Sequence, residues 1–214
     1  GGRYGLSSKD TNLNDIDALY EYLNTKSLRE FTLGINDDVT NLSLQRTDRI
    51  FNKDYDEILI YGYGSDGMVS ASKSFMKLIG NNTNKYVQGY FQYDSKKSGG
   101  VTKCHLRFND NMIRSTYYVE NPSIVVVTKD TYLDNFDCIS NLSKNGIFIL
   151  NTEKDNIYDI DGNILKYIKD NNIKFYKINA YEIANKLGIP NKISTIMESI
   201  LAYLTNLMDY DNAK

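Results

Sequence analysis

Cysteine and histidine are scarce in this sequence, and their scarcity excludes several kinds of site. The 214 residues contain two cysteines and one histidine, and Cys104 and Cys138 lack the C-x-x-C spacing of paired ligands. Structural zinc, an iron–sulfur cluster and a disulfide framework all need more of these side chains. We therefore expect no metal centre and no disulfide in this chain, and a reducing cytoplasm is the simplest fit for its location.

Long apolar runs and a net positive charge are absent as well. No stretch of about eighteen consecutive apolar residues occurs, and the first residues have neither the charged nor the apolar part of a signal peptide. The formal net charge of -2 gives no overall basic field that would attract nucleic acid. We expect a soluble protein with neither nucleic acid nor a membrane as partner, in which any anion site is a local cluster of charge.

From Glu57 onward, strand patterns alternate with helix patterns. Apolar runs at 58–61, 124–127 and 147–150 are typical of buried parallel strands. Further extended segments are expected at 86–93, 101–108, 112–119 and 173–178. Helices are expected at 71–79, near 132–139 and at 193–208, together with one that ends near residue 170 and a short one that continues through residue 184. The alternation predicts a three-layer, Rossmann-like α/β domain with a mainly parallel sheet covered on both faces.

The first 56 residues follow a different pattern. Apolar positions from Leu13 to Leu23 share one helical face, with Asn12 available as the N-cap residue. A strand is expected at 31–35. The polar stretch 36–56 has little periodicity, and we place a soft domain boundary within it.

Three glycines form the motif that is most suggestive of a ligand. Gly62, Gly64 and Gly67 have the G-x-G-x-x-G spacing of dinucleotide-binding loops, after a predicted strand and before a predicted helix. Small residues let backbone N–H groups approach a phosphate, and the helix N-terminus adds a positive dipole end. The position also fits, because ligands of such sheets bind at the carboxyl ends of strands. The motif favours anion binding, although a tight turn without a ligand would select the same glycines.

A nicotinamide cofactor is one candidate for this loop. Such a loop is usually paired with an acidic residue at the end of the second strand, and Asp94 has roughly that position. Two observations weaken this interpretation: Lys96 and Lys97 follow directly, and Asp66 places a carboxylate where a pyrophosphate would come close. An NAD(P)-binding oxidoreductase of Rossmann type therefore stays as the alternative.

A cationic strand face is the second candidate feature. Alternation over 101–108 places Lys103, His105 and Arg107 on one side of the strand and Cys104 on the other. The cationic side would form a local positive patch suited to phosphates, or an ordinary solvated strand face. We expect His105 to have a structural or binding role rather than to hold a metal, and we expect no nucleophilic pair with Cys104, which points the other way.

Several stretches of the chain resemble the pyruvate:ferredoxin (flavodoxin) oxidoreductases. They are "GGRYGLSSK" at 1–9, "FTLGINDDVTNLSL" at 31–44, "YGYGSDGMVSASK" at 61–73, "QGYFQYDSKKSGGVTKCHLRF" at 88–108 and "IRSTYYV" at 113–119. Weaker similarity continues through "FILNT" at 148–152 and "IPNKISTIMESI" at 189–200, so the resemblance covers nearly the whole chain. The stretch 93–100 is its most specific part.

The resemblance implies a division of the chain into two parts. Residues 30–214 would be the gamma-type domain of a much larger enzyme, and residues 1–29 would be the tail of the preceding domain with its connecting helix. Gly1 and Gly2 would then be native residues. The family loop usually reads G-A-D-G-T-V-G-A-N-K, and this chain departs from it at Ser65, Met68, Ser70 and Ser72 while keeping the glycines, the aspartate and the lysine.

Members of the family oxidatively decarboxylate pyruvate with thiamine diphosphate, pass electrons through iron–sulfur clusters to ferredoxin or flavodoxin, and release acetyl-CoA. This chain has too few cysteines for clusters and no G-D-G motif for thiamine diphosphate and magnesium. The resemblance therefore implies that those cofactors lie on other domains, that the chain is not catalytic alone, and that the intact enzyme is a homo-oligomer. Its implied partners are the other domains and the ferredoxin or flavodoxin.

The gamma-type domain of this family is associated with coenzyme A, whose phosphates would suit the glycine loop and the lysines. The resemblance and the glycine motif together imply a set of residues that contact coenzyme A. They are Gly62, Gly64, Asp66, Gly67, Lys73, Lys96, Lys97 and Arg107. Lys97 is the first choice among them. A third interpretation gives the domain no ligand and only a role in shaping a subunit interface.

Overall fold

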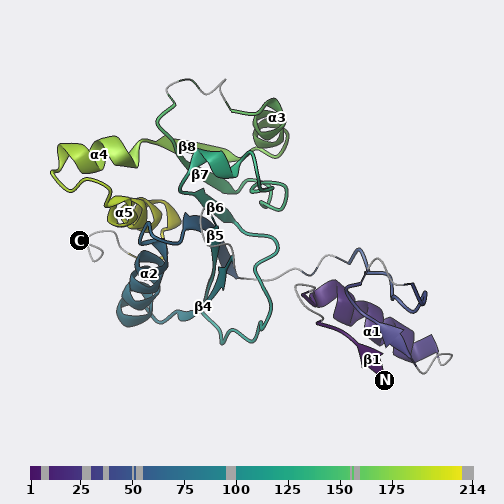
Figure 1. The fold of residues 1–214 in the computed structure, drawn as a ribbon. Coiled ribbons are helices and arrows are strands. Elements are labelled where there is room, and N and C mark those ends of the chain that lie inside the picture. Colours follow the sequence, from purple (N-terminus) through teal and green to yellow (C-terminus); the bar gives the residue numbers. More distant parts are fainter. Residues whose placement is uncertain are drawn as a thin grey trace. The chain divides into compact units, whose positions relative to one another are not determined.

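The computed structural model describes residues 1–5, 10–25, 30–35, 39–49, 51, 55–94, 100–154, 156 and 160–208. The chain forms two compact units, which are described separately (Figure 1). Unit 1 comprises Gly1–Lys53 with Ser115–Tyr118, and unit 2 comprises Asp54–Arg114 with Val119–Lys214. The division after residue 53 falls in the polar stretch where the sequence placed a soft boundary. The finer division between residues 29 and 30 stays a prediction.

Unit 1 is a small strand–helix–strand arrangement. β1 (Gly2–Arg3) and β2 (Phe31–Thr32) pair in parallel, and α1 (Leu13–Thr25) connects them. α1 begins with a reciprocal cap, since Asn12 N donates to Asp15 Oδ2 and Asp15 N donates to Asn12 Oδ1, both at 3.0 Å. The helix and the N-cap residue predicted from the sequence are thus confirmed, whereas the strand predicted at 31–35 is limited to two residues.

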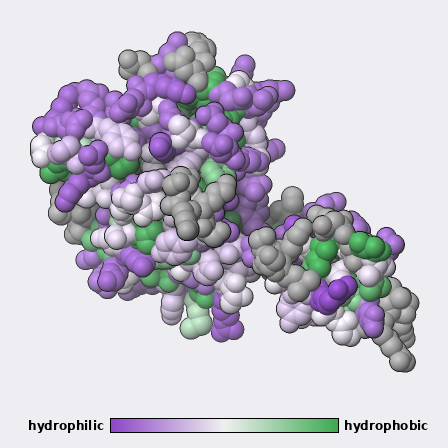
Figure 2. Space-filling view, viewed as in Figure 1, coloured by the Kyte–Doolittle hydropathy of each residue, from purple (hydrophilic) through white to green (hydrophobic). Residues whose placement is uncertain are grey.

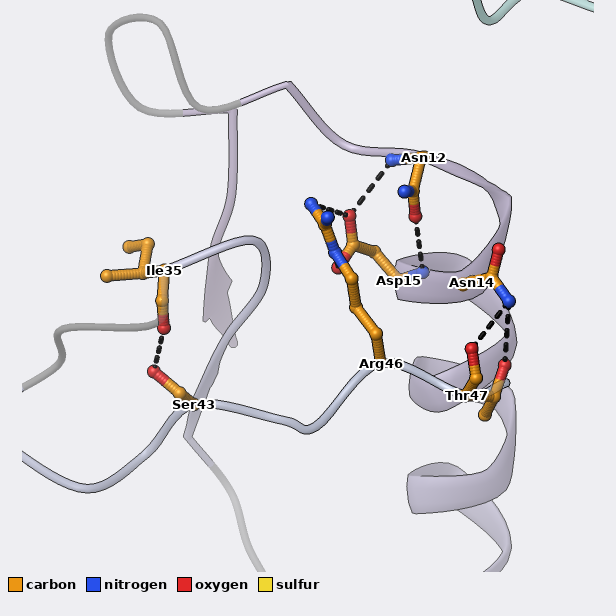
Figure 3. A network of polar contacts seen from close by, with 7 residues as sticks. All are labelled: Asn12, Asn14, Asp15, Ile35, Ser43, Arg46 and Thr47. Carbon is orange, nitrogen blue, oxygen red and sulfur yellow. Dashed lines mark hydrogen bonds and ion pairs between the residues drawn. The ribbon is translucent and has the colours of Figure 1, made fainter. Parts of the chain in front are cut away.

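A polar network attaches the segment after β2 to α1 (Figure 3). Asp15 is buried, and Arg46 binds its carboxylate through Nε at 2.7 Å and Nη2 at 3.0 Å. On the next face of the helix, the Asn14 side chain donates to the carbonyl of Thr47. A bidentate arginine on a buried carboxylate is among the stronger polar contacts available to a protein, so polar contacts hold much of this unit together.

Unit 2 is built on one six-stranded sheet with the order β4-β5-β3-β6-β7-β8. The strands are β3 (Asp56–Tyr63), β4 (Tyr86–Tyr93), β5 (Val101–Asn109), β6 (Ile124–Val127), β7 (Ile147–Asn151) and β8 (Lys174–Ile178). β3, β6, β7 and β8 are parallel neighbours, and β5 is antiparallel to both β3 and β4. The predicted mainly parallel sheet is confirmed, with β5 as its one reversed strand because it returns from β4 into the place beside β3.

Helices cover both faces of this sheet (Figure 1), which confirms the predicted three layers. α2 (Met68–Asn82), α4 (Ala180–Lys186) and α5 (Ile193–Thr205) pack on one face, where Phe75 and Met197 meet Ile60. α3 (Gly162–Asp170) packs on the other face, against the side of the sheet that carries Phe148 and Leu150. Hydrophilic residues cover much of the molecular surface in view (Figure 2), and no helix in the part of the chain that the structure describes is long and apolar enough to cross a membrane.

Two further predicted elements differ from the structure. The helix expected near 132–139 is a short 3₁₀ helix, η1 (Asp130–Tyr132), followed by turns. The Asp137 carboxylate accepts the N–H groups of Ile139 and Ser140, which offers the backbone an alternative to helical pairing. The extended segment expected at 112–119 forms no strand.

Candidate functional site

The glycine loop lies at the carboxyl end of β3 and leads into α2. Gly62 has little room for a side chain, because an added Cβ would lie 3.0 Å from Met68 Cβ and 3.4 Å from an Asp66 carboxylate oxygen. Gly64 is less constrained, since the nearest atom to its added Cβ would be Thr102 Oγ1 at 3.6 Å. Residues 63–65 are exposed, so the turn presents its tip to solvent.

Gly67 is the N-cap residue of α2 and has a left-handed backbone, with φ of 80°. A Cβ at this position would lie 2.9 Å from Ser194 Oγ in α5. A side chain would therefore meet both conformational strain and a packing clash. The geometry of the turn alone accounts for glycine at 62 and 67, without a ligand.

Asp66 uses both of its carboxylate oxygens inside this turn. Oδ1 accepts the N–H of Met68 at 2.9 Å, and Oδ2 accepts the N–H of Tyr63 at 2.7 Å and the hydroxyl of Thr128 at 2.9 Å. Burial raises the pKa of Asp66, and these three hydrogen bonds lower it in part. Because Met68 begins α2, the protein's own carboxylate already holds an amide that a phosphate at this helix N-terminus would need.

Polar residues at the ends of β6 and β7 extend the network that begins at Asp66. Asn151 Nδ2 donates to the carbonyl of Thr128 at 2.9 Å, and its Oδ1 accepts the N–H of Ala180, where α4 begins, at 2.8 Å. Thr152 donates its hydroxyl to Asp130 Oδ2 at 2.8 Å. The sequence reasoning missed these residues, although each follows a buried-strand run and so lies at the edge where ligands of such sheets bind.

Exposed lysines in this part of unit 2 include Lys129 and Lys73. Lys129 follows β6, and its Nζ lies 5.6 Å from the ring centroid of Tyr63, the last residue of β3. Lys73, in the second turn of α2, has its Nζ 5.1 Å from the ring centroid of Phe91 in β4. Lys73 was predicted as a site residue, whereas Lys129 was missed. The position of Lys129, two residues after a buried-strand run, was the signal that could have found it.

The structure does not bring Arg107 to the glycine loop. Arg107 lies opposite Glu57, near the start of β3, while the loop follows its end. Six residues of strand separate Glu57 from Tyr63, which corresponds to about 20 Å. Arg107 Nε donates to Glu57 Oε1 at 2.6 Å and Nη1 donates to Gln88 Oε1 at 3.0 Å, and the Arg107 and Glu57 side chains are 3% and 5% exposed.

The strand face that carries Arg107 is not solvated, so that alternative is wrong. His105 is buried and only Lys103 is half-buried, with its Nζ 5.3 Å from the ring centroid of Tyr61. The cause is the segment that leads to β6, because Val119 lies over this face and donates its N–H to His105 Nδ1 at 3.2 Å. Cys104 points to the opposite, apolar face, as predicted.

Burial governs the titration of the histidine and the thiols. Burial, followed by the charges of Lys103 and Arg107, lowers the pKa of His105 to about 4, so its imidazole is neutral at pH 7. Burial also raises the pKa of Cys104 to about 11 and that of Cys138 to about 12. Both thiols are buried and protonated at neutral pH, which removes them as nucleophiles.

Two predicted site residues and the acidic residue of the nicotinamide alternative remain. Lys96 and Lys97 lie outside the described residues, which stop at Asp94 and resume at Gly100. Asp94 follows β4, and β5 separates β4 from β3. Two strand spacings, about 10 Å, therefore lie between Asp94's strand and the strand of the glycine loop, whereas the dinucleotide fold places these two strands side by side.

Neither of two cavities lined by described residues includes the glycine loop. One cavity of about 490 Å³ lies between residues 133–140 and α3, and one of about 450 Å³ lies between β7, β8, α4 and α5. No group of three or more histidine, cysteine, aspartate or glutamate side chains among these residues could hold a metal ion. The candidate site is therefore the exposed polar edge formed by the glycine loop and Lys129.

A comparison with protein families matches residues 57–214 to the family described as pyruvate ferredoxin/flavodoxin oxidoreductase. Relatives similar to the whole chain include a pyruvate-flavodoxin oxidoreductase of Trichormus variabilis at 40% identity and a pyruvate:ferredoxin oxidoreductase of Moorella thermoacetica at 37%. The chain spans 18% and 19% of these two proteins, about a fifth of the length of each.

Solved structures show the same fold. A pyruvate oxidoreductase subunit of Thermotoga maritima is 26% identical, with a TM-score of 0.58 over 75% of this chain and 82% of that one. A 2-oxoglutarate:ferredoxin oxidoreductase of Magnetococcus marinus, solved with 2-oxoglutarate, coenzyme A and succinyl-CoA bound, is 14% identical, with a TM-score of 0.55 over 71% of this chain and 24% of that one. Because the Magnetococcus marinus protein is only 14% identical, its similarity to this chain shows a shared fold and nothing more.

Proposed function

We propose that this chain, which belongs to the pyruvate ferredoxin/flavodoxin oxidoreductase family, is a coenzyme A-handling and assembly domain of a larger enzyme. That enzyme would oxidatively decarboxylate pyruvate, join the acetyl group to the thiol of coenzyme A, and pass two electrons to ferredoxin or flavodoxin. Thiamine diphosphate, Mg²⁺ and the iron–sulfur clusters would belong to its other domains, and this chain alone would be inactive.

The position of the glycine loop carries the coenzyme A proposal. From β3 the chain crosses through α2 to β4 on one side of the sheet, and it later returns to β6 on the other side. The loop therefore lies at a point where the strand order reverses, which is where open α/β sheets bind their ligands. A solved structure of the same fold contains coenzyme A, which supports this choice of ligand.

We divide the eight site residues predicted from the sequence into two groups. We propose that Gly64, Lys73, Lys96 and Lys97 contact the ligand, and we add Lys129 because it is exposed beside the loop. Gly62, Asp66 and Gly67 would hold the shape of the turn, and Arg107 would act within the sheet. The phosphates would then meet lysine side chains rather than the amides that begin α2.

Calorimetric titration of the intact enzyme with coenzyme A tests this assignment. Lys97→Ala and Lys129→Ala should each weaken binding roughly tenfold, since each removes a charge-assisted phosphate contact. Lys166→Ala, which alters an exposed lysine on α3, is the control and should leave the affinity unchanged. Unchanged affinity in both test variants would remove the coenzyme A assignment, and binding of NADH in its place would support the Rossmann-type alternative.

We also propose the setting of the intact enzyme. Residues 1–29 would be the tail of its preceding domain and residues 30–214 its gamma-type domain. The enzyme would be a cytoplasmic homo-oligomer, with the scarcity of cysteine in this chain as the supporting observation for the compartment. The length of the parent reading frame tests the first part, because a gene of only 214 codons would contradict it.

A further inference from the structure

Two faces of α1 are occupied by contacts within unit 1. One face carries Asp15 and Ala18, which are buried, and Tyr22, whose ring centroid lies 5.6 Å from that of Phe31 in β2. A second face is polar. On it, Asp17 and Glu21 both accept hydrogen bonds from Arg49, at 2.7 and 3.2 Å.

The third face of α1 is apolar and exposed. Ile16, Tyr20 and Leu23 recur at the i, i+4 and i+7 spacing of a single stripe, and they are 38%, 66% and 61% exposed. A helix with apolar side chains on two of its faces is normally enclosed on both. The stripe is thus the part of α1 that the described residues of unit 1 leave uncovered.

The described residues of unit 1 also form very little of the apolar core that a unit of its size needs. Among its described residues, only Ala18 and Leu33 are buried apolar side chains. Its strands are two residues each, and β1 pairs only with β2 in the described part of the chain. Parallel sheets occur almost only where both faces are covered by other elements. A domain this small would not gain enough from burial to be stable alone.

We propose that the Ile16–Tyr20–Leu23 stripe docks against an apolar surface of the same polypeptide that lies outside these 214 residues. This inference rests on the proposed function, in which the chain is one part of a larger enzyme. The similar proteins are about five times as long as this chain, so ample polypeptide is available as the occupant. The stripe contains no charged residue, so its partner surface is aliphatic or aromatic rather than ionic.

Thiol labelling of the full-length polypeptide tests the docking. Leu23→Cys places a thiol in the stripe, and Asn24→Cys places one at the next, exposed polar position of the same helix as a matched control. In the folded full-length enzyme, Leu23→Cys should react with a maleimide at least about tenfold more slowly than Asn24→Cys, with rates read by peptide mass spectrometry. Tyr20→Cys should be protected to the same extent. In the 214-residue chain, both thiols should react at similar rates.

Three outcomes would overturn the proposal. Equal rates in the full-length enzyme would show that nothing covers the stripe. Protection already present in the 214-residue chain would assign the cover to that chain itself, and protection lost on dilution would assign it to a second copy. The labelling uses no coenzyme A, so failed coenzyme A binding leaves its result intact, whereas a parent gene of 214 codons would remove the larger enzyme that both ideas assume.

Discussion

Asp66 illustrates how far a single residue can be interpreted before its neighbours are known. Its place inside the glycine loop indicated that a carboxylate would oppose a pyrophosphate. The sequence did not indicate which groups the carboxylate would bind, because one of its hydrogen-bond donors is Thr128, which lies 62 residues further along the chain. In the structure, the Asp66 carboxylate accepts the N–H of Met68, the first residue of α2. The glycine spacing of a dinucleotide-binding loop therefore occurs here at a helix N-terminus that the protein's own side chain already occupies.

The glycines of the loop should respond unequally to substitution. Gly67→Ala should lower the free energy of unfolding by more than about 1 kcal/mol, because it places a side chain at φ of 80° and within 2.9 Å of Ser194 Oγ. Gly64→Ala is the matched control and should change it by less than about 0.5 kcal/mol. Urea unfolding monitored by circular dichroism gives both values, and equal losses would contradict the packing argument.

His105 should make stability depend on pH. Its pKa of about 4 in the folded protein lies below the ordinary 6.5, so the unfolded chain binds the proton more readily between these values. Stability is therefore complete above about pH 6.5 and falls toward pH 4. By about pH 4.5 the loss should reach about 2–3 kcal/mol.

His105→Asn tests this contribution, since its amide oxygen can still accept the N–H of Val119. Unfolding free energies at about pH 7 and pH 4.5 should differ by about 2–3 kcal/mol less in the variant than in the original protein. The same pH dependence in both proteins would show that another group is responsible.

At the scale of elements, the pair Glu57–Arg107 connects β3 to β5 inside the sheet. Arg107→Met should lower the free energy of unfolding by about 3–5 kcal/mol, because it leaves the buried Glu57 carboxylate without its partner. The double variant Glu57→Leu with Arg107→Met removes both charges and should recover most of this loss. Equilibrium unfolding of the single and double variants in a mutant cycle measures the coupling.

The same variant separates the two roles considered for Arg107. A role within the sheet predicts lower stability with little change in coenzyme A affinity of the folded intact enzyme. A contact with a phosphate predicts the reverse, namely weaker binding with stability nearly unchanged. The second result would return Arg107 to the ligand site.

Three buried parallel strands were predicted well because their short apolar runs are rich in β-branched residues, which favour strands over helices. The runs at 58–61, 124–127 and 147–150 became β3, β6 and β7. The helix expected near 132–139 failed because local hydrogen bonds of Asp137 decided the backbone there, which apolar spacing does not reveal. In the site, the glycines followed from their spacing, whereas the separation of Arg107 from the loop depended on strand register, which a single sequence does not specify.

At the scale of the whole molecule, the two apolar clusters both belong to unit 2. A chain limited to residues 55–214 should therefore fold cooperatively, with a single urea transition and native near-ultraviolet circular dichroism. Deletion of the first 54 residues removes only two buried apolar side chains among those described, Ala18 and Leu33. Retained helix signal with lost aromatic signal would instead indicate a molten globule and contradict this expectation.

The place of β5 beside β3 in the sheet has a consequence for folding during synthesis. β3 pairs with β5 and β6, which both follow it in the sequence, so the apolar run at 58–61 leaves the ribosome before either partner exists. At about 5–20 residues per second, β5 is complete roughly 2–9 s after β3. Throughout that interval an apolar strand with two open edges is available to other chains. The speed of translation between residues 64 and 109 therefore helps to decide what fraction of new chains reaches the native sheet before aggregating.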